Sequence, residues 1–460
     1  MVKSILRFLG FDRAVSFGIL ARAWSLLAGP VTIVIIATGF MPEQQGFYYT
    51  FGSLLALQSF FDLGLMFVIA QFASHEFVHL SWGPRGSIEG APVALKRLTD
   101  LLCKTVLWFG VASVLMIVLL VPAGLIFFGQ KGAVSFTWRL PWVLAVVGTA
   151  LNLFVMPFFA IIMGSGDVVT VNKRELAGAV LSSLLSWLVI SLHGGLYSVF
   201  AVNVGTIAIA WGYLCIKRPG LLKLAWVGHF GKDKGPRHDS ELSWWGEIWP
   251  MQWRVAISTG FAYFLCQLFN PILFHYHGSV VAGQMGMTMS VANALLAGSF
   301  TVMFSKTPQF GKLVAVHDWA GLDRLFGKSL RQMTMLVTAG AVVGVTIVGL
   351  LQAYSQYGKR FIPVGEAAIL FASVCLQAVY SSFGVYLRAH KKEPLMFVSA
   401  IGSIIQGGLA WYLGKRFSSL GVSLGYFIAT TFFTLPAILF VWLRFRKKWH
   451  GNSDANIDLA

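Results

Sequence analysis

The sequence predicts an all-α polytopic membrane protein with about twelve transmembrane helices, arranged as two pseudo-symmetric six-helix bundles around a central cavity. Of its 460 residues, 57% are hydrophobic and 12% are charged, and the mean hydropathy is +0.72. Apolar runs of about 20 residues, the length that a helix needs to cross a bilayer, recur along the whole chain. The polar stretches between them reach at most about 30 residues, which is too short for a soluble domain with its own core.

Each predicted span is a run of this kind, and the longest polar stretch, 217–244, divides the spans six and six. The expected limits of the spans are 14–40, 47–75, 98–128, 139–163, 175–193, 195–216, 245–273, 279–305, 332–354, 362–387, 395–414 and 417–445. We expect an N-terminal lobe over 1–216, a cytoplasmic linker over 217–244, a C-terminal lobe over 245–446 and a cytoplasmic tail over 447–460. Pro, Gly and mixed charges mark the linker, in which the segment LLKLAW is able to lie flat on the membrane surface.

Lysine and arginine residues between the spans set the expected orientation. With the N-terminus inside, the interior segments hold 26 of them and the exterior segments hold 6. Such an excess predicts that both termini lie in the cytoplasm. The same bias accounts for the net charge of +17, so that no nucleic-acid partner is expected.

A short internal repeat supports two related lobes. The third span is preceded by Leu95-Lys-Arg97-Leu98, and the ninth by Leu322-Asp-Arg324-Leu325. The segment GFYYTFGS follows the first helix of one lobe, and GQMGMTMS follows the first helix of the other. Because six spans preserve the orientation of the chain, such repeats are related by an axis along the membrane normal.

Two arginines interrupt the apolar runs at similar depth, Arg22 in the first span and Arg254 in the seventh. An arginine in hydrocarbon costs about 2.5–3.5 kcal/mol on insertion scales, and ionisable residues inside a membrane mark functional sites by default. The guanidinium group never loses its charge and binds phosphate through two hydrogen bonds. We therefore expect Arg22 and Arg254 to bind an anionic substrate in the cavity. The alternatives are that each arginine snorkels to the cytoplasmic headgroups or pairs with a buried carboxylate.

Asp62 is the carboxylate deepest in a predicted span. It is a candidate partner of Arg22 in an ion pair, or a candidate site for a coupling proton or cation. The sequence leaves both interpretations open.

The sequence lacks the motifs that are typical of metal binding and of nucleotide binding. The four cysteines, Cys103, Cys215, Cys266 and Cys375, have no CxxC spacing, and the histidines show no metal-ligand spacing such as HExxH. There is no GxxxxGK[ST] motif for nucleotide phosphates. We therefore expect no metal, no cofactor and no enzymatic activity.

The opening hairpin resembles that of the bacterial polysaccharide transporter family, which belongs to the multidrug/oligosaccharidyl-lipid/polysaccharide flippase superfamily. The resemblance covers Arg22, Pro42-Glu-Gln-Gln-Gly46-Phe-Tyr and Phe61-Asp62-Leu-Gly64-Leu, and it extends to the amphipathic segment from Leu322 to Arg331. The number of spans and their division into lobes agree with the family over nearly the whole chain.

This resemblance implies a flippase of the bacterial cytoplasmic (inner) membrane. It would move an undecaprenyl-pyrophosphate-linked oligosaccharide across the bilayer by alternating access, for the synthesis of surface polysaccharides such as O-antigen. The implied partners are the lipid-linked oligosaccharide, membrane lipids, and a glycan polymerase or export machinery.

Two other function classes stay open. A multidrug and toxin extruder of the same superfamily carries cationic drugs and is expected to have an acidic cavity, whereas the clearest intramembrane pair here is basic. A membrane glycan polymerase or ligase is expected to have a large exterior loop with catalytic residues, and every predicted exterior loop is short.

Overall fold

The computed structural model describes residues 13–130, 134–230, 244–250, 252–253, 256, 261, 263, 267–390 and 394–451. This part of the chain is almost entirely helical, and ten of its helices are long and apolar enough to cross a membrane. The predicted fold class is therefore confirmed. Part of the predicted seventh span, 245–273, falls outside the described residues, including position 254.

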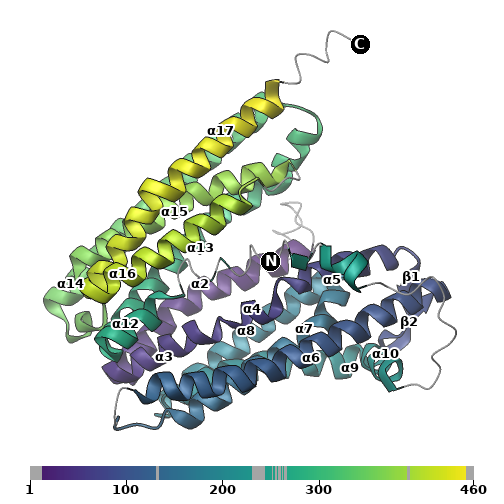
Figure 1. Cartoon of the computed structure of the whole chain (residues 1–460), viewed down its shortest axis with the longest axis horizontal. Helices are drawn as coiled ribbons and strands as arrows, with labels where there is room; N and C mark the ends of the chain where they lie inside the picture. Colours follow the sequence, from purple (N-terminus) through teal and green to yellow (C-terminus); the bar gives the residue numbers. More distant parts are fainter. Residues whose placement is uncertain are drawn as a thin grey trace, which may run out of the picture. The chain divides into compact units, whose positions relative to one another are not determined.

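The chain divides into two compact units (Figure 1). Unit 1 contains Met1–Phe40 and Phe51–Gly260, and unit 2 contains Met41–Thr50 and Phe261–Ala460. Helix α3 (Pro42–Leu55) thus has its first nine residues in unit 2 and its remainder in unit 1. The lobe and linker limits at 216, 244 and 446 stay predictions.

Unit 1 is a helical bundle with one small hairpin. Its further elements are α2 (Arg13–Gly39), α4 (Gln58–Asp62), α5 (Leu65–Glu76), β1 (Leu80–Trp82), η1 (Pro84–Gly86), β2 (Ile88–Gly90), α6 (Pro92–Gly129), α7 (Arg139–Gly164), α8 (Val168–Ser191), α9 (Tyr197–Lys217), α10 (Pro219–Phe230) and η2 (Trp244–Ile248). Helix α2 packs against α8, α8 against α9, and α6 against α7.

Small and polar side chains hold these helices together, because apolar contacts alone give little preference for protein over lipid. The indole of Trp187 on α8 donates to Thr32 Oγ1 on α2 at 2.8 Å. Between α7 and α9, Asn152 Nδ2 donates to Asn203 Oδ1 at 2.9 Å. The two asparagines therefore link neighbouring helices.

The hairpin of β1 and β2 was not predicted from the sequence. The two strands are antiparallel, with Leu80 opposite Gly90 and Trp82 opposite Ile88. Trp82 carries the guanidinium of Arg218 over its ring at 3.9 Å, and Arg218 also pairs with Asp167 at 2.9 Å. This contact ties the hairpin to the end of α9 and the start of α8.

Unit 2 contains α12 (Phe269–His277), α13 (Ser279–Ala315), α14 (Trp319–Tyr354), η3 (Gln356–Arg360), α15 (Val364–Ala389), α16 (Met396–Ile428), η4 (Ala429–Thr434) and α17 (Leu435–Gly451). Helix α16 has two antiparallel arms, because Phe417 and Ser418 leave the helical conformation and the chain turns back there. A Cβ on Gly421 in the second arm would lie 2.0 Å from the carbonyl oxygen of Leu413 in the first arm. Only glycine allows the arms to approach this closely.

Candidate functional site

Asp62 lies where the second predicted span is interrupted. This span is not one helix, since α4 ends at Asp62 and α5 begins at Leu65. Leu63 and Gly64 between them adopt the left-handed conformation, with φ of 50° and 67°. A backbone break inside a membrane leaves amide and carbonyl groups that lipid cannot satisfy.

The carboxylate of Asp62 accepts hydrogen bonds from some of these backbone groups. The backbone amides of Gly64 and Met66, at the start of α5, donate to it. Its Oδ1 atom is buried and has no hydrogen-bond partner among the described residues. Asp62 therefore caps the second part of a broken membrane helix and keeps one acceptor for another donor or a cation.

Arg22 is exposed on α2, near the start of the apolar span Leu20–Gly39 and nine residues after α2 begins at Arg13. Trp24 and Thr32 on the same helix face α8, since their side chains hydrogen-bond to Ser183 and Trp187 there. Arg22 is thus an exposed residue on a helix that packs against α8 through Trp24 and Thr32. Arg254, its predicted counterpart, lies outside the described residues.

Arg97 forms an ion-pair cluster that the sequence did not predict. Its Nε donates to Glu76 Oε1 at 2.9 Å, and its Nη2 donates to Glu247 Oε2 at 2.9 Å. The cluster joins α5, α6 and η2. Next to it, Trp108 stacks on Trp244 with ring centroids 5.8 Å apart. The start of the predicted seventh span is therefore bonded to α6.

The corresponding region of unit 2 has the opposite arrangement of charge. Here the acidic residue Asp323 on α14 is central, and it accepts from Arg446 Nε on α17 at 3.1 Å and from the Tyr386 hydroxyl on α15 at 2.8 Å. Arg324, the counterpart of Arg97 in the sequence repeat, is exposed. The repeat therefore preserves the helix but not the ion pair.

The starts of α3 and α13 cross very closely within unit 2, at equivalent positions of the second sequence repeat. A Cβ on Gly283 would lie 2.8 Å from the amide nitrogen of Gly46, and a Cβ on Gly286 would lie 2.4 Å from Cβ of Tyr49. The buried side chain of Gln45 donates to the carbonyl oxygens of Gly283 at 2.8 Å and Arg360 at 3.0 Å. Burial of Arg360 lowers the pKa of its guanidinium. This crossing requires glycine on both helices.

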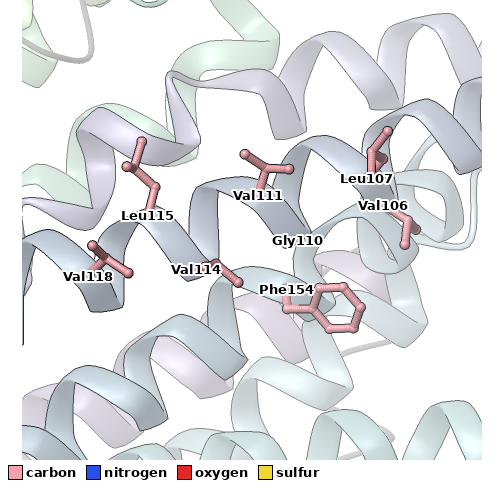
Figure 2. A pocket seen from close by; sticks show the side chains of 8 residues that line it. All are labelled: Val106, Leu107, Gly110, Val111, Val114, Leu115, Val118 and Phe154. Carbon is pink, nitrogen blue, oxygen red and sulfur yellow. The ribbon is translucent and has the colours of Figure 1, made fainter.

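An apolar groove runs along unit 1, with a volume of about 570 Å3 (Figure 2). Seven of its lining residues come from α6 and one, Phe154, comes from α7. Gly110 on α6 lies beside the ring of the half-buried Phe154, while Val111 and Val118 are 60% and 59% exposed. These side chains offer contact to hydrocarbon and no hydrogen bond to a polar headgroup.

Within the described ranges, no three His, Cys, Asp or Glu side chains come together in a way that could hold a metal ion.

No protein-family model matches this chain, and no curated protein matches it. Solved structures do match. The chain is similar to a multidrug resistance transporter of the MATE family and the MOP superfamily in its inward-facing conformation, with a TM-score of 0.68 and 14% identity over 96% of this chain and 98% of that one. It is similar to the lipid II flippase MurJ in an inward closed conformation, with a TM-score of 0.63 and 13% identity over 95% and 90% of the two chains.

A third similar structure is the MATE multidrug transporter DinF-BH. Its TM-score is 0.57, and it is 15% identical over 94% of this chain and 95% of that one. At this level of identity the likeness shows the fold alone. The chain has the fold of MOP superfamily members.

Proposed function

We propose that this chain is a membrane flippase that moves an undecaprenyl-pyrophosphate-linked oligosaccharide across the bacterial inner membrane for surface polysaccharide synthesis. The observation that carries the proposal is an exposed arginine, Arg22, near the start of a membrane span, in a chain with a fold like that of the flippase MurJ. An exposed guanidinium at this position fits a pyrophosphate better than a cationic drug.

In this proposal, the two parts of the substrate, the pyrophosphate and the isoprenoid tail, interact with different surroundings. Arg22, together with the predicted Arg254, binds the pyrophosphate. The isoprenoid tail stays in the lipid, where apolar surfaces such as the α6 groove are compatible with it. Net movement requires alternating access to the two leaflets, and the proposal includes no covalent step and no catalytic residue.

A second candidate is a multidrug extruder, and Asp62 is the observation that favours it. Two of the similar structures are MATE multidrug transporters, so the fold supports both candidates equally. The carboxylate of Asp62, with one buried oxygen that lacks a partner among the described residues, would serve a cation or a proton. The sign of the transported charge therefore distinguishes the two candidates.

Reconstitution in liposomes tests the proposal. A fluorescent undecaprenyl-pyrophosphate oligosaccharide and a cationic dye are compared in vesicles that contain the full chain or none. We expect protein-dependent exchange of the anionic lipid between leaflets and no accumulation of the dye. Accumulation of the dye alone would establish the extruder instead, and movement of neither probe would exclude both assignments.

A further inference from the structure

Unit 2 contains a π-helical turn, η4 (Ala429–Thr434), in the middle of the last predicted span. The amide of Ala429 still bonds to the carbonyl oxygens of Gly425 and Tyr426, as in an α-helix. The amide of Leu435 instead donates to the carbonyl oxygen of Thr430, five residues back. The turn therefore contains one residue more than the α-helices on either side of it.

The threonines of this turn have lost their ordinary acceptors. The hydroxyl oxygens of Thr430, Thr431 and Thr434 are buried and have no hydrogen-bond partner among the described residues. Thr430 and Thr434 are only 0% and 3% exposed. A buried hydroxyl without a partner destabilises the fold, so a change of conformation that gave these threonines acceptors would stabilise the turn.

Four threonines in regular helices of the same chain show the hydrogen bond that is missing. Thr32, Thr105, Thr288 and Thr346 each donate to the carbonyl oxygen four residues back, at 2.7–2.8 Å. A π-helical turn moves that carbonyl away, since the ring of backbone atoms is wider. Conversion of η4 to α-helix would return an acceptor to each of its threonines.

Such a conversion would rotate the helix that follows. One residue corresponds to roughly 100° of α-helix. In the present register Trp442 on α17 lies 4.9 Å from Phe383 on α15, between ring centroids. Arg446 on α17 pairs with Asp323, which also accepts from Tyr386. A rotation of this size would break these contacts, so they hold the turn in its π form.

We propose that η4 is a two-state element, in which an α form that satisfies the threonines competes with a π form that keeps Arg446 on Asp323. A change at the end of α17 would thereby alter helix geometry inside the membrane span. This goes beyond the proposed function, because it holds for any transported substrate.

Deletion of Phe432 tests whether the extra residue exists. Phe432 is 67% exposed, so its removal costs little packing, and it would turn η4 into α-helix without changing the register on either side. We expect its unfolding midpoint to stay within about 4 °C of the wild-type value. The control is deletion of Val342, 61% exposed in the regular helix α14, which would shift the register and sharply lower the midpoint. Equal losses in both variants would overturn the proposal.

Amide hydrogen exchange of the full chain in nanodiscs tests the coupling. We expect the peptide over 425–440 to exchange about tenfold faster in the wild type than in the Phe432 deletion, because only the wild type interconverts. Arg446→Ala, which removes the ion pair, should change that exchange by a similar factor. The matched control Arg444→Ala, an exposed arginine on the same helix, should leave it unchanged. Unchanged exchange in Arg446→Ala would also overturn the proposal.

Discussion

Arg97 and Asp323 lie at neighbouring positions of the sequence repeat and carry opposite charges, yet each is the centre of an ion-pair cluster. The charge is central only because other helices bring its partners, Glu76 and Glu247 in one case and Arg446 in the other. A motif read along one segment contains no information about those partners. The repeat therefore predicts where a charged cluster lies and not its sign.

Arg22 is the residue on which the proposed substrate depends most. We expect Arg22→Ala to lower flipping of the labelled pyrophosphate lipid at least about tenfold, since a lost charge-assisted hydrogen bond costs about 1.5–3 kcal/mol. Because Arg22 is exposed, the unfolding midpoint should barely change. Arg22→Lys should keep part of the activity, because it retains the charge and loses the planar fork.

Lys104→Ala is the matched control for Arg22→Ala, since Lys104 is also a basic residue near the end of a predicted span. It should have a mild effect on flipping. Full activity of Arg22→Ala would indicate that Arg22 extends to the lipid headgroups and does not bind the substrate.

Asp62 combines a backbone role with a charge, and two substitutions separate them. Asp62→Ala removes the acceptor for the amides of Gly64 and Met66, and should lower stability by about 1 kcal/mol, as the loss of a helix cap does. Asp62→Asn keeps an acceptor and should stay close to wild-type stability. Thermal unfolding in detergent measures both.

Transport by the Asp62→Asn variant then decides the role of the charge. If Asp62 binds a coupling proton or cation, the variant should be stable and lose the dependence of transport on an ion gradient. If transport still depended on the ion gradient to the same extent, the role of Asp62 would be to cap the helix.

At the scale of elements, the crossing of α3 and α13 provides the sharpest test of packing. A Cβ on Gly46 would lie 1.9 Å from the carbonyl oxygen of Ser279, so Gly46→Ala must push two helix backbones apart. We expect a loss of about 1–3 kcal/mol, the usual cost of overpacking. Gly52→Ala on the same helix is the control, since nothing lies within 4 Å of its added Cβ, and it should be neutral or slightly stabilising. Equal stability of the two variants would contradict the described crossing.

The helical membrane fold class was predictable from the sequence, because hydropathy depends on each segment alone. The break after Asp62 was not, since a leucine at φ 50° follows no local preference and only Gly64 hints at it. The β1–β2 hairpin was also missed, because it depends on the stacking of Arg218 on Trp82, which is far away in sequence. Gln45 belongs to the motif that carries the family resemblance, but its contacts were not predictable, because its acceptors lie 238 and 315 residues away.

For the whole molecule, the orientation in the membrane is the property to measure first. The excess of lysine and arginine in alternate loops predicts that both termini are cytoplasmic. A fluorescent protein fused to the C-terminus should therefore be bright in bacterial cells, and alkaline phosphatase fused there should be inactive. The same reporters fused after Ser355, in a predicted exterior segment, should give the reverse result. A bright fluorescent fusion at both sites would refute the predicted alternation of cytoplasmic and exterior loops.

The division of α3 between the units also has a consequence for biosynthesis. Residues 41–50 are made early, yet their partners at Gly283 and Arg360 are made only after most of the chain has entered the membrane. Until then Gln45 has no acceptor in unit 2, and the glycine face of α3 has no helix to pack against. The first hairpin to be inserted is therefore among the last parts of the protein to complete its packing, and a ribosome that stalls midway leaves a chain whose earliest helices are unfinished.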